Sequence, residues 1–232
     1  MTVSFERDGK VAVLTLDDGK ANALSLDVLR DIDQGLSRAL DENATAVLVA
    51  GRPGRFSAGF DLSVMTSGEQ PMRELVTAGA ELCIRLFIHP MPVVCACTGH
   101  ALAAGALVLL SGDVRIGARG EFRIGLNEVA IGLGLPAFAV ELARYRLTAR
   151  AFNASLLGEV FAPDDAVDAG FLDQVVAPDE VVELALVEAR RLAELRTGAV
   201  EFSKDRARGA LARHMAQTLD ADLRDLAPPR PR

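Results

Sequence analysis

Strand-like segments followed by helical ones recur along the chain, and this alternation limits the folds available to it more than any other feature. Residues 2–7 and 11–16 are typical of two paired strands around an Asp8-Gly9 turn. Buried strands are predicted at 46–51, 93–99 and in "DVRIGA" (113–118). Helical spacing occurs at 26–40, where Ser25 is a suitable N-cap, at about 72–87 and in "ALAAGALVLLS" (101–111). Such alternation favours stacked ββα turns or parallel crossovers. The sequence therefore predicts an α/β fold.

The last third of the chain is predicted to be mostly helical. From Pro136 onward the helical pattern is broken by one late strand in "FLDQVVA" (171–177), and the terminal "PPRPR" (228–232) predicts a frayed end. No linker composition separates the parts. We expect an α/β core over residues 1–176 and a helical region over 177–232 that packs on the core and on a neighbouring subunit.

Composition and charge narrow the function classes. A net charge of −7 argues against nucleic acid as a partner, and no apolar run reaches the roughly 18 residues of a membrane-spanning helix. The N-terminal "MTVSFERDGK" has no secretory pattern, so we expect a cytoplasmic protein. Three cysteines and three histidines are scattered without metal-ligand spacing, which predicts buried thiols and no metal site: Cys83, Cys95, Cys97, His89, His100 and His214.

Two segments of small residues could bring backbone N–H groups close to a ligand. One is "RFSAGFDLS" (55–63) and the other is "TGHALAAGAL" (98–107), where a strand gives way to a helix. Small side chains leave the backbone accessible, and amides at a helix start are unpaired. Two such donors would form an oxyanion hole. For either segment alone, tight packing of glycine and alanine is the better explanation.

One acid stands in an apolar run. In "FRIGLNEVAIGLGLP" (122–136), Glu128 is surrounded by aliphatic residues, and Arg123 and Asn127 are the only other polar side chains. A solvated or helix-starting carboxylate is the ordinary explanation. The alternative is a general base whose pKa is raised by its apolar surroundings.

Taken together, four motifs resemble the crotonase superfamily of enoyl-CoA hydratases and isomerases. "ANALS" (21–25) resembles the loop near the coenzyme A, and "GRPGRFSAGFDLSVM" (51–65) is similar to the signature loop of the family. "PVVCACTGHALAAGALVLLSGDVRIGA" (92–118) and "DDAVDAGFLDQVV" (164–176) resemble the next two motifs, in the family's order. The resemblance implies a spiral of repeated ββα units, a helical C-terminal region, and a homotrimer or dimer of trimers.

The resemblance also implies a site for an acyl-CoA thioester, in an enzyme of fatty acid metabolism (β-oxidation). Coenzyme A would be part of the substrate, with no other cofactor and no metal. By motif position, the backbone N–H groups of Phe60 and Ala104 would form the oxyanion hole. The residues around the substrate and its coenzyme A would be Ala21, Ala23, Leu24, Ala58, Gly59, Asp61 and Leu62, with Leu107 and Leu133 as apolar walls. Asp61 is expected to support its loop rather than react.

The reaction depends on how many acids reach the substrate. Hydratases of this family have two glutamates; here the first position holds Leu107 and the second holds Glu128. "IGLNE" (124–128) closely resembles the Δ3,Δ2-enoyl-CoA isomerase branch, in which one glutamate shuttles the proton. We therefore expect an isomerase.

Other functions remain open on the same scaffold. A hydratase could have recruited Glu69, Glu74 or Glu81; a hydrolase, a decarboxylase or a catalytically silent acyl-CoA-binding protein are further alternatives. Phe87, Phe138 and Phe152 are candidates for a pocket around the acyl tail, although aromatic residues more often belong to the core.

Overall fold

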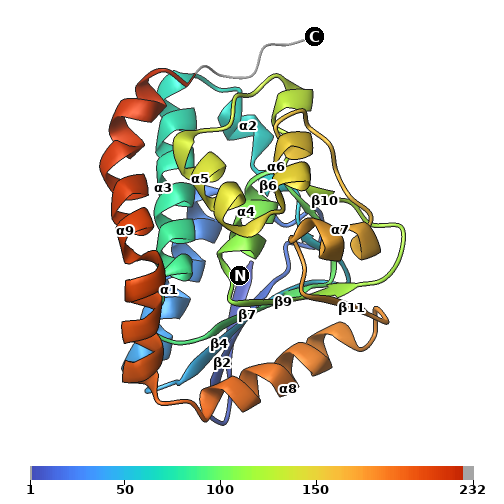
Figure 1. Cartoon of the computed structure of the whole chain (residues 1–232), viewed down its shortest axis with the longest axis vertical. Helices are drawn as coiled ribbons and strands as arrows, with labels where there is room; N and C mark the ends of the chain where they lie inside the picture. Colours follow the sequence, from blue (N-terminus) through green and yellow to red (C-terminus); the bar gives the residue numbers. More distant parts are fainter. Residues whose placement is uncertain (1, 227–232) are drawn as a thin grey trace.

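A six-stranded sheet forms the base of the molecule in a computed structural model that describes residues 2–226 (Figure 1). Its strand order is β1-β2-β4-β7-β9-β11; β1 and β2 form the antiparallel hairpin that the sequence predicts, and the other pairs are parallel. The strands are β1 (Val3–Asp8), β2 (Val11–Leu16), β4 (Ala46–Gly51), β7 (Val93–Cys97), β9 (Val114–Ala118) and β11 (Gln174–Val176). The late strand is shorter than the predicted 171–177.

Smaller sheets stand beside the main one. Three strands pair in the order β10-β8-β5, and two in the order β3-β6. They are β3 (Ala23–Leu24), β5 (Gly54–Ser57), β6 (Gly59–Phe60), β8 (Gly99–Leu102) and β10 (Ile124–Gly125). Each of β4, β7 and β9 is followed in sequence by a strand of the second sheet and then by a helix. The chain is therefore the predicted spiral of ββα units.

The helices gather mainly on one side of the main sheet. They are α1 (Leu26–Asp41), α2 (Leu62–Met65), α3 (Glu69–Phe87), α4 (Ala104–Ser111), the 3-10 turn η1 (Val129–Ile131), α5 (Ala137–Arg146), α6 (Ala149–Ser155), α7 (Pro163–Ala169), α8 (Val181–Ala193) and α9 (Thr197–Arg224). Ser25 caps α1 as predicted, its side chain accepting from Val28 N. Helix α3 begins before the predicted Met72, because Pro71 lies in the first turn, where a missing N–H costs nothing.

The central strands are buried on both faces. In β4, Val47 and Val49 face one hydrophobic cluster while Ala46, Leu48 and Ala50 face the other, as the period-2 geometry of a strand requires. Helix α8 covers the second face, and α1, α3, α4, α5 and α9 pack over the first (Figure 1). The three cysteines are buried, as predicted. Within residues 2–226, none of the helices has the length and apolar content needed to cross a bilayer.

Ion pairs attach the last elements to the spiral, and those of Asp113 are buried. Asp113, just before β9, accepts from Lys204 Nζ at 2.8 Å and from Arg208 Nη1 at 2.5 Å, both on α9. Arg115 in β9 makes a bidentate pair with Asp173, at 3.1 and 2.6 Å, beside β11. Lys204 and Arg208 attach α9 to the start of β9, and α9 runs along α3 toward the upper part of the molecule (Figure 1). The predicted frayed "PPRPR" lies outside the described residues.

Candidate active site

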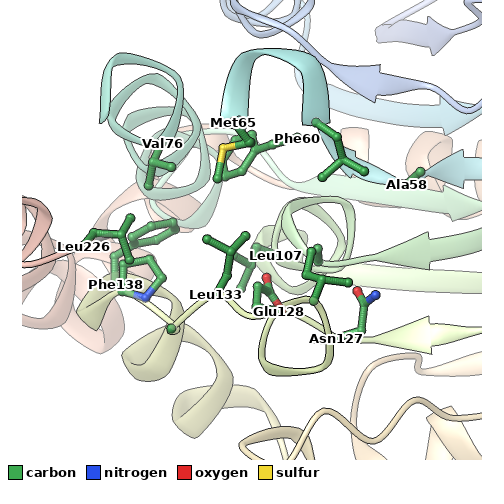
Figure 2. A pocket seen from close by; sticks show the side chains of 15 residues that line it. Ala58, Phe60, Met65, Val76, Leu107, Asn127, Glu128, Leu133, Phe138 and Leu226 are labelled. Carbon is green, nitrogen blue, oxygen red and sulfur yellow. The ribbon is translucent and has the colours of Figure 1, made fainter. Parts of the chain in front are cut away.

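A pocket of about 130 Å³ lies between the small β3-β6 sheet and the helices α3, α4 and α5 (Figure 2). Its walls come from the segment 58–65, from α3 and α4, from the loop 127–136, from α5, and from Leu226 after α9. Among the described residues that line it, Glu128 is the only ionisable one, and Asn127 is the only other polar one. The pocket is therefore an apolar cavity with a single carboxylate.

The backbone around Glu128 folds into a tight turn. Glu128 directly precedes η1, and its carbonyl oxygen accepts from Ile131 N at 3.0 Å and from Leu133 N at 2.9 Å. Gly132 ends the turn with φ of 81°, a left-handed conformation that suits glycine. This turn fixes the Cα of Glu128 and directs its side chain into the pocket (Figure 2).

Burial sets the acidity of Glu128. The residue is 8% exposed, and its Oε2 has no hydrogen-bond partner among the described residues. Burial disfavours the charged form and raises the pKa of the carboxyl group to about 7, although the residue's own backbone N–H opposes the shift. A carboxyl group with this pKa can both accept and return a proton near neutral pH.

The first small-residue segment is held by "ANALS". Strand β3 pairs in parallel with β6, Ala58 N donates to Ala21 O at 3.0 Å, and Asp61 N donates to Leu24 O at 3.1 Å. Asp61 also caps α2, its carboxylate accepting from Ser63 N at 2.9 Å. These bonds hold residues 58–61 against residues 21–24 at the edge of the pocket.

The second small-residue segment meets the first at the start of α4. A β-carbon placed on Gly59 would lie 3.3 Å from Ala104 N, so the two backbones approach closely there. Ala103, which caps α4, has φ of 50° and lines the pocket. The residues of α4 that follow it are all buried. The fold thus brings together the two segments that the sequence singled out.

Comparison with known proteins gives the family. The profile described as enoyl-CoA hydratase/isomerase matches residues 6–228, nearly the whole chain. The chain belongs to this family. A solved enoyl-CoA hydratase/isomerase family protein from Pseudomonas syringae is 42% identical and has a TM-score of 0.94, over 97% of this chain and 98% of that one. The fold is accordingly that of the crotonases.

Relatives within the enoyl-CoA hydratase/isomerase family carry both activity names. The mitochondrial enoyl-CoA delta isomerase 1 of Homo sapiens is 32% identical over 93% of this chain and 73% of its own length. A probable enoyl-CoA hydratase of Bacillus subtilis is 33% identical over 72% of this chain and 66% of its own. The chain thus spans about two thirds to three quarters of the length of these curated relatives. The family assignment therefore does not distinguish isomerase activity from hydratase activity.

The residues that the resemblance assigned to the site divide into two groups. Six of them line the pocket: Ala58, Phe60, Leu62, Leu107, Glu128 and Leu133. The others lie behind or beside the lining: Ala21, Ala23, Leu24, Gly59, Asp61 and Ala104. Of the three phenylalanine candidates, Phe138 lines the pocket, but Phe87 and Phe152 do not. Phe87 is fully buried and packs edge-on against Tyr145, so for this residue the core role is the right one.

Several lining residues carried no signal that sequence reasoning could use. Met65, Val76, Ile131, Pro136 and Leu226 come from four separate parts of the chain. An aliphatic residue at helical spacing predicts burial, but the spacing is the same for a residue of the core and for one that lines a pocket. Only Asn127 differed from its surroundings, since the sequence already marked it as a polar neighbour of Glu128.

Proposed function

We propose that this enzyme is a Δ3,Δ2-enoyl-CoA isomerase in which Glu128 alone transfers the proton. The observation that carries the proposal is that Glu128 is the only ionisable side chain among the described residues lining the pocket. The carboxylate removes a proton from C2 of a 3-enoyl-CoA, and the electron pair moves onto the thioester oxygen to give a dienolate with double bonds C1–C2 and C3–C4. Glu128, now protonated, returns a proton at C4, which leaves the double bond between C2 and C3.

The dienolate oxygen needs hydrogen-bond donors, and we take two backbone amides for this role. Ala58 N and Asp61 N both donate toward the 21–24 segment. Phe60 lies between these two residues and lines the pocket, and we take its N–H as the first donor. Ala104 N lies at the start of α4, where helical amides have no intrahelical partner. We assign these two N–H groups to the thioester oxygen, where each such donor contributes about 3–4 kcal/mol.

The isomerase is favoured over the hydratase by what surrounds Glu128. Hydration requires a held water and a second group to manage the proton, whereas Leu107 presents only a hydrocarbon side chain to the pocket. The three glutamates that a hydratase could have recruited lie elsewhere: Glu69, Glu74 and Glu81 are exposed and line a separate groove on α3. An apolar pocket that excludes water also protects the dienolate from side reactions.

The test is a comparison of two substrates with one variant. Purified wild-type protein should convert 3-hexenoyl-CoA to 2-hexenoyl-CoA much faster than it hydrates crotonyl-CoA. Glu128→Gln should reduce isomerisation at least about a hundredfold, the low end of general-base contributions. Glu81→Gln is the matched control, because it makes the same change at an exposed site outside the pocket. Faster hydration than isomerisation would identify a hydratase, and binding of acyl-CoA without any turnover would identify a silent binder.

A further inference from the structure

The pocket ends on a wall of packed side chains remote from Glu128. Figure 2 shows Glu128 and Asn127 at one end and Val76, Phe138 and Leu226 at the other. Val76 and Phe138 are each 2% exposed, so they belong to the core as well as to the pocket. Val76 comes from α3, Phe138 from α5, and Leu226 from the segment after α9. Three separate elements therefore close this end.

Two hydrogen bonds fasten the end of α9 against this wall. Asp222 Oδ2 accepts from Ala137 N at 2.6 Å, at the start of α5 and next to Phe138. Arg73 Nη2, on α3, donates to Arg224 O at 2.8 Å. A carboxylate at a helix N-terminus is stabilised by the helix dipole and by the unpaired amides. Leu226 therefore follows a helix end that is tied to both of the other elements of the wall.

The size of the pocket then limits the acyl chain. Its volume of about 130 Å³ is close to that of an engineered apolar cavity of about 150 Å³ that takes up benzene, a molecule of six carbons. The proposed function places the thioester at the Phe60 and Ala104 amides and C2 at Glu128, so the rest of the acyl group points toward the wall.

We propose that the enzyme is specific for short acyl chains of about six carbons, and that Phe138 sets the limit. This inference rests on the proposed function for the orientation of the substrate. Phe138 is the largest side chain of the wall, and it is 2% exposed, so other core side chains pack around its ring. A longer tail has to displace the ring or the end of α9, and either displacement breaks packed contacts.

The experiment measures kcat/KM for 3-hexenoyl-, 3-octenoyl-, 3-decenoyl- and 3-dodecenoyl-CoA. For the wild type, we expect the value to fall at least about tenfold from hexenoyl to decenoyl, since one misplaced methylene in an apolar pocket changes it by about 10-fold or more. Phe138→Ala should raise the decenoyl value above the hexenoyl value. Phe138→Leu should shift the preference in the same direction by less, and it serves if the alanine variant does not fold.

Phe152→Ala is the matched control, because Phe152 lies on α6, outside the pocket and under the Arg144 guanidinium at 5.2 Å. It should leave the chain-length profile unchanged. Equal wild-type rates for all four lengths, or an unchanged profile in a folded Phe138 variant, would overturn the chain-length limit while leaving the isomerase intact.

A binding measurement separates the two proposals. Calorimetric dissociation constants for saturated hexanoyl- and decanoyl-CoA require no turnover. Weaker binding of the longer chain, reversed in Phe138→Ala, supports the limit even if no isomerisation is detected, in which case only the proposed function fails. Equal affinities for the two chains in the wild type would overturn the limit by themselves.

Discussion

Gly59 and Ala103 lie so close together that a β-carbon on Gly59 would stand 2.9 Å from the Ala103 methyl group. Gly59 has φ of 95° and Ala103 has φ of 50°, so both residues occupy conformations with positive φ. Through this contact, the segment 58–61 packs against the start of α4. Any side chain at residue 59 would push the two proposed oxyanion donors, Phe60 N and Ala104 N, apart.

Gly59→Ala should therefore reduce kcat for isomerisation by about a hundredfold, the typical loss for one oxyanion donor. Gly54→Ala is the matched control, because Gly54 has φ of 79° but nothing within 4 Å of an added β-carbon. Both variants introduce comparable backbone strain, and only the first introduces a close contact. Equal losses of kcat in the two variants would assign the effect to strain rather than to the donors.

The rate should depend on pH through Glu128. Burial raises the pKa of its carboxyl group to about 7, and only the ionised form can take the C2 proton. We expect kcat/KM, which reports groups of the free enzyme, to rise about tenfold per pH unit below about 7 and to level off above it. Initial rates from about pH 5 to about pH 9 test this. A profile that is flat across neutral pH would show that Glu128 does not act as the base.

The same burial destabilises the folded state when the Glu128 carboxyl group is ionised. Its folded pKa of about 7 exceeds the ordinary value of 4.5, so ionisation favours the unfolded chain. The cost is absent below about pH 4.5 and complete above about pH 7, where it reaches about 3 kcal/mol. Glu128→Gln cannot ionise, so it should have a higher Tm than the wild type at pH 8 and a similar Tm at pH 4.5. Calorimetry at both pH values checks the sign, and a lower Tm at pH 8 would contradict it.

The ion pairs at the base of α9 should matter more than those on the surface. Asp113→Asn leaves Lys204 and Arg208 buried with no compensating charge, and should lower the free energy of unfolding by about 3–5 kcal/mol. Asp164→Asn is the control, since its pair with Arg119 is exposed and should contribute less than about 1 kcal/mol. Urea unfolding of both variants measures the difference, and equal losses would contradict it.

The pH dependence of this contribution has the opposite sign to that of Glu128. Burial alone would raise the pKa of Asp113, but Lys204 and Arg208 outweigh it and hold the pKa below the ordinary value of 3.8. The stabilisation is complete above that value and is lost as the pH falls below it. Asp113→Asn should therefore differ most from the wild type near neutral pH and least in strong acid.

Periodicity alone predicted most of the fold. The hairpin, the buried strands and the cap at Ser25 follow from local patterns, and the structure confirms them. The pairing of the short strands into smaller sheets was not predicted. A strand of two residues, such as Ala23–Leu24, has no detectable period and pairs only through tertiary contacts. The division at 176/177, the homotrimer, the cytoplasmic location and the absence of a cofactor stay predictions.

The site could be predicted only where its chemistry is unusual. Glu128 stood out as one acid in an apolar run, and the small residues of 55–63 and 98–107 stood out by composition. The far wall did not, because Val76, Phe138 and Leu226 have the same signature as any core residue. Which aliphatic side chains face a cavity depends on how distant elements pack, and that information is not local.

The pocket draws its lining from residues as far apart in sequence as Ala58 and Leu226. Contacts of such long range form late, because the intervening chain must first lose its conformational freedom. During refolding, the helical circular dichroism signal should therefore recover before catalysis does. We expect turnover of a 3-enoyl-CoA to return only once α9 has docked, since Leu226 follows that helix.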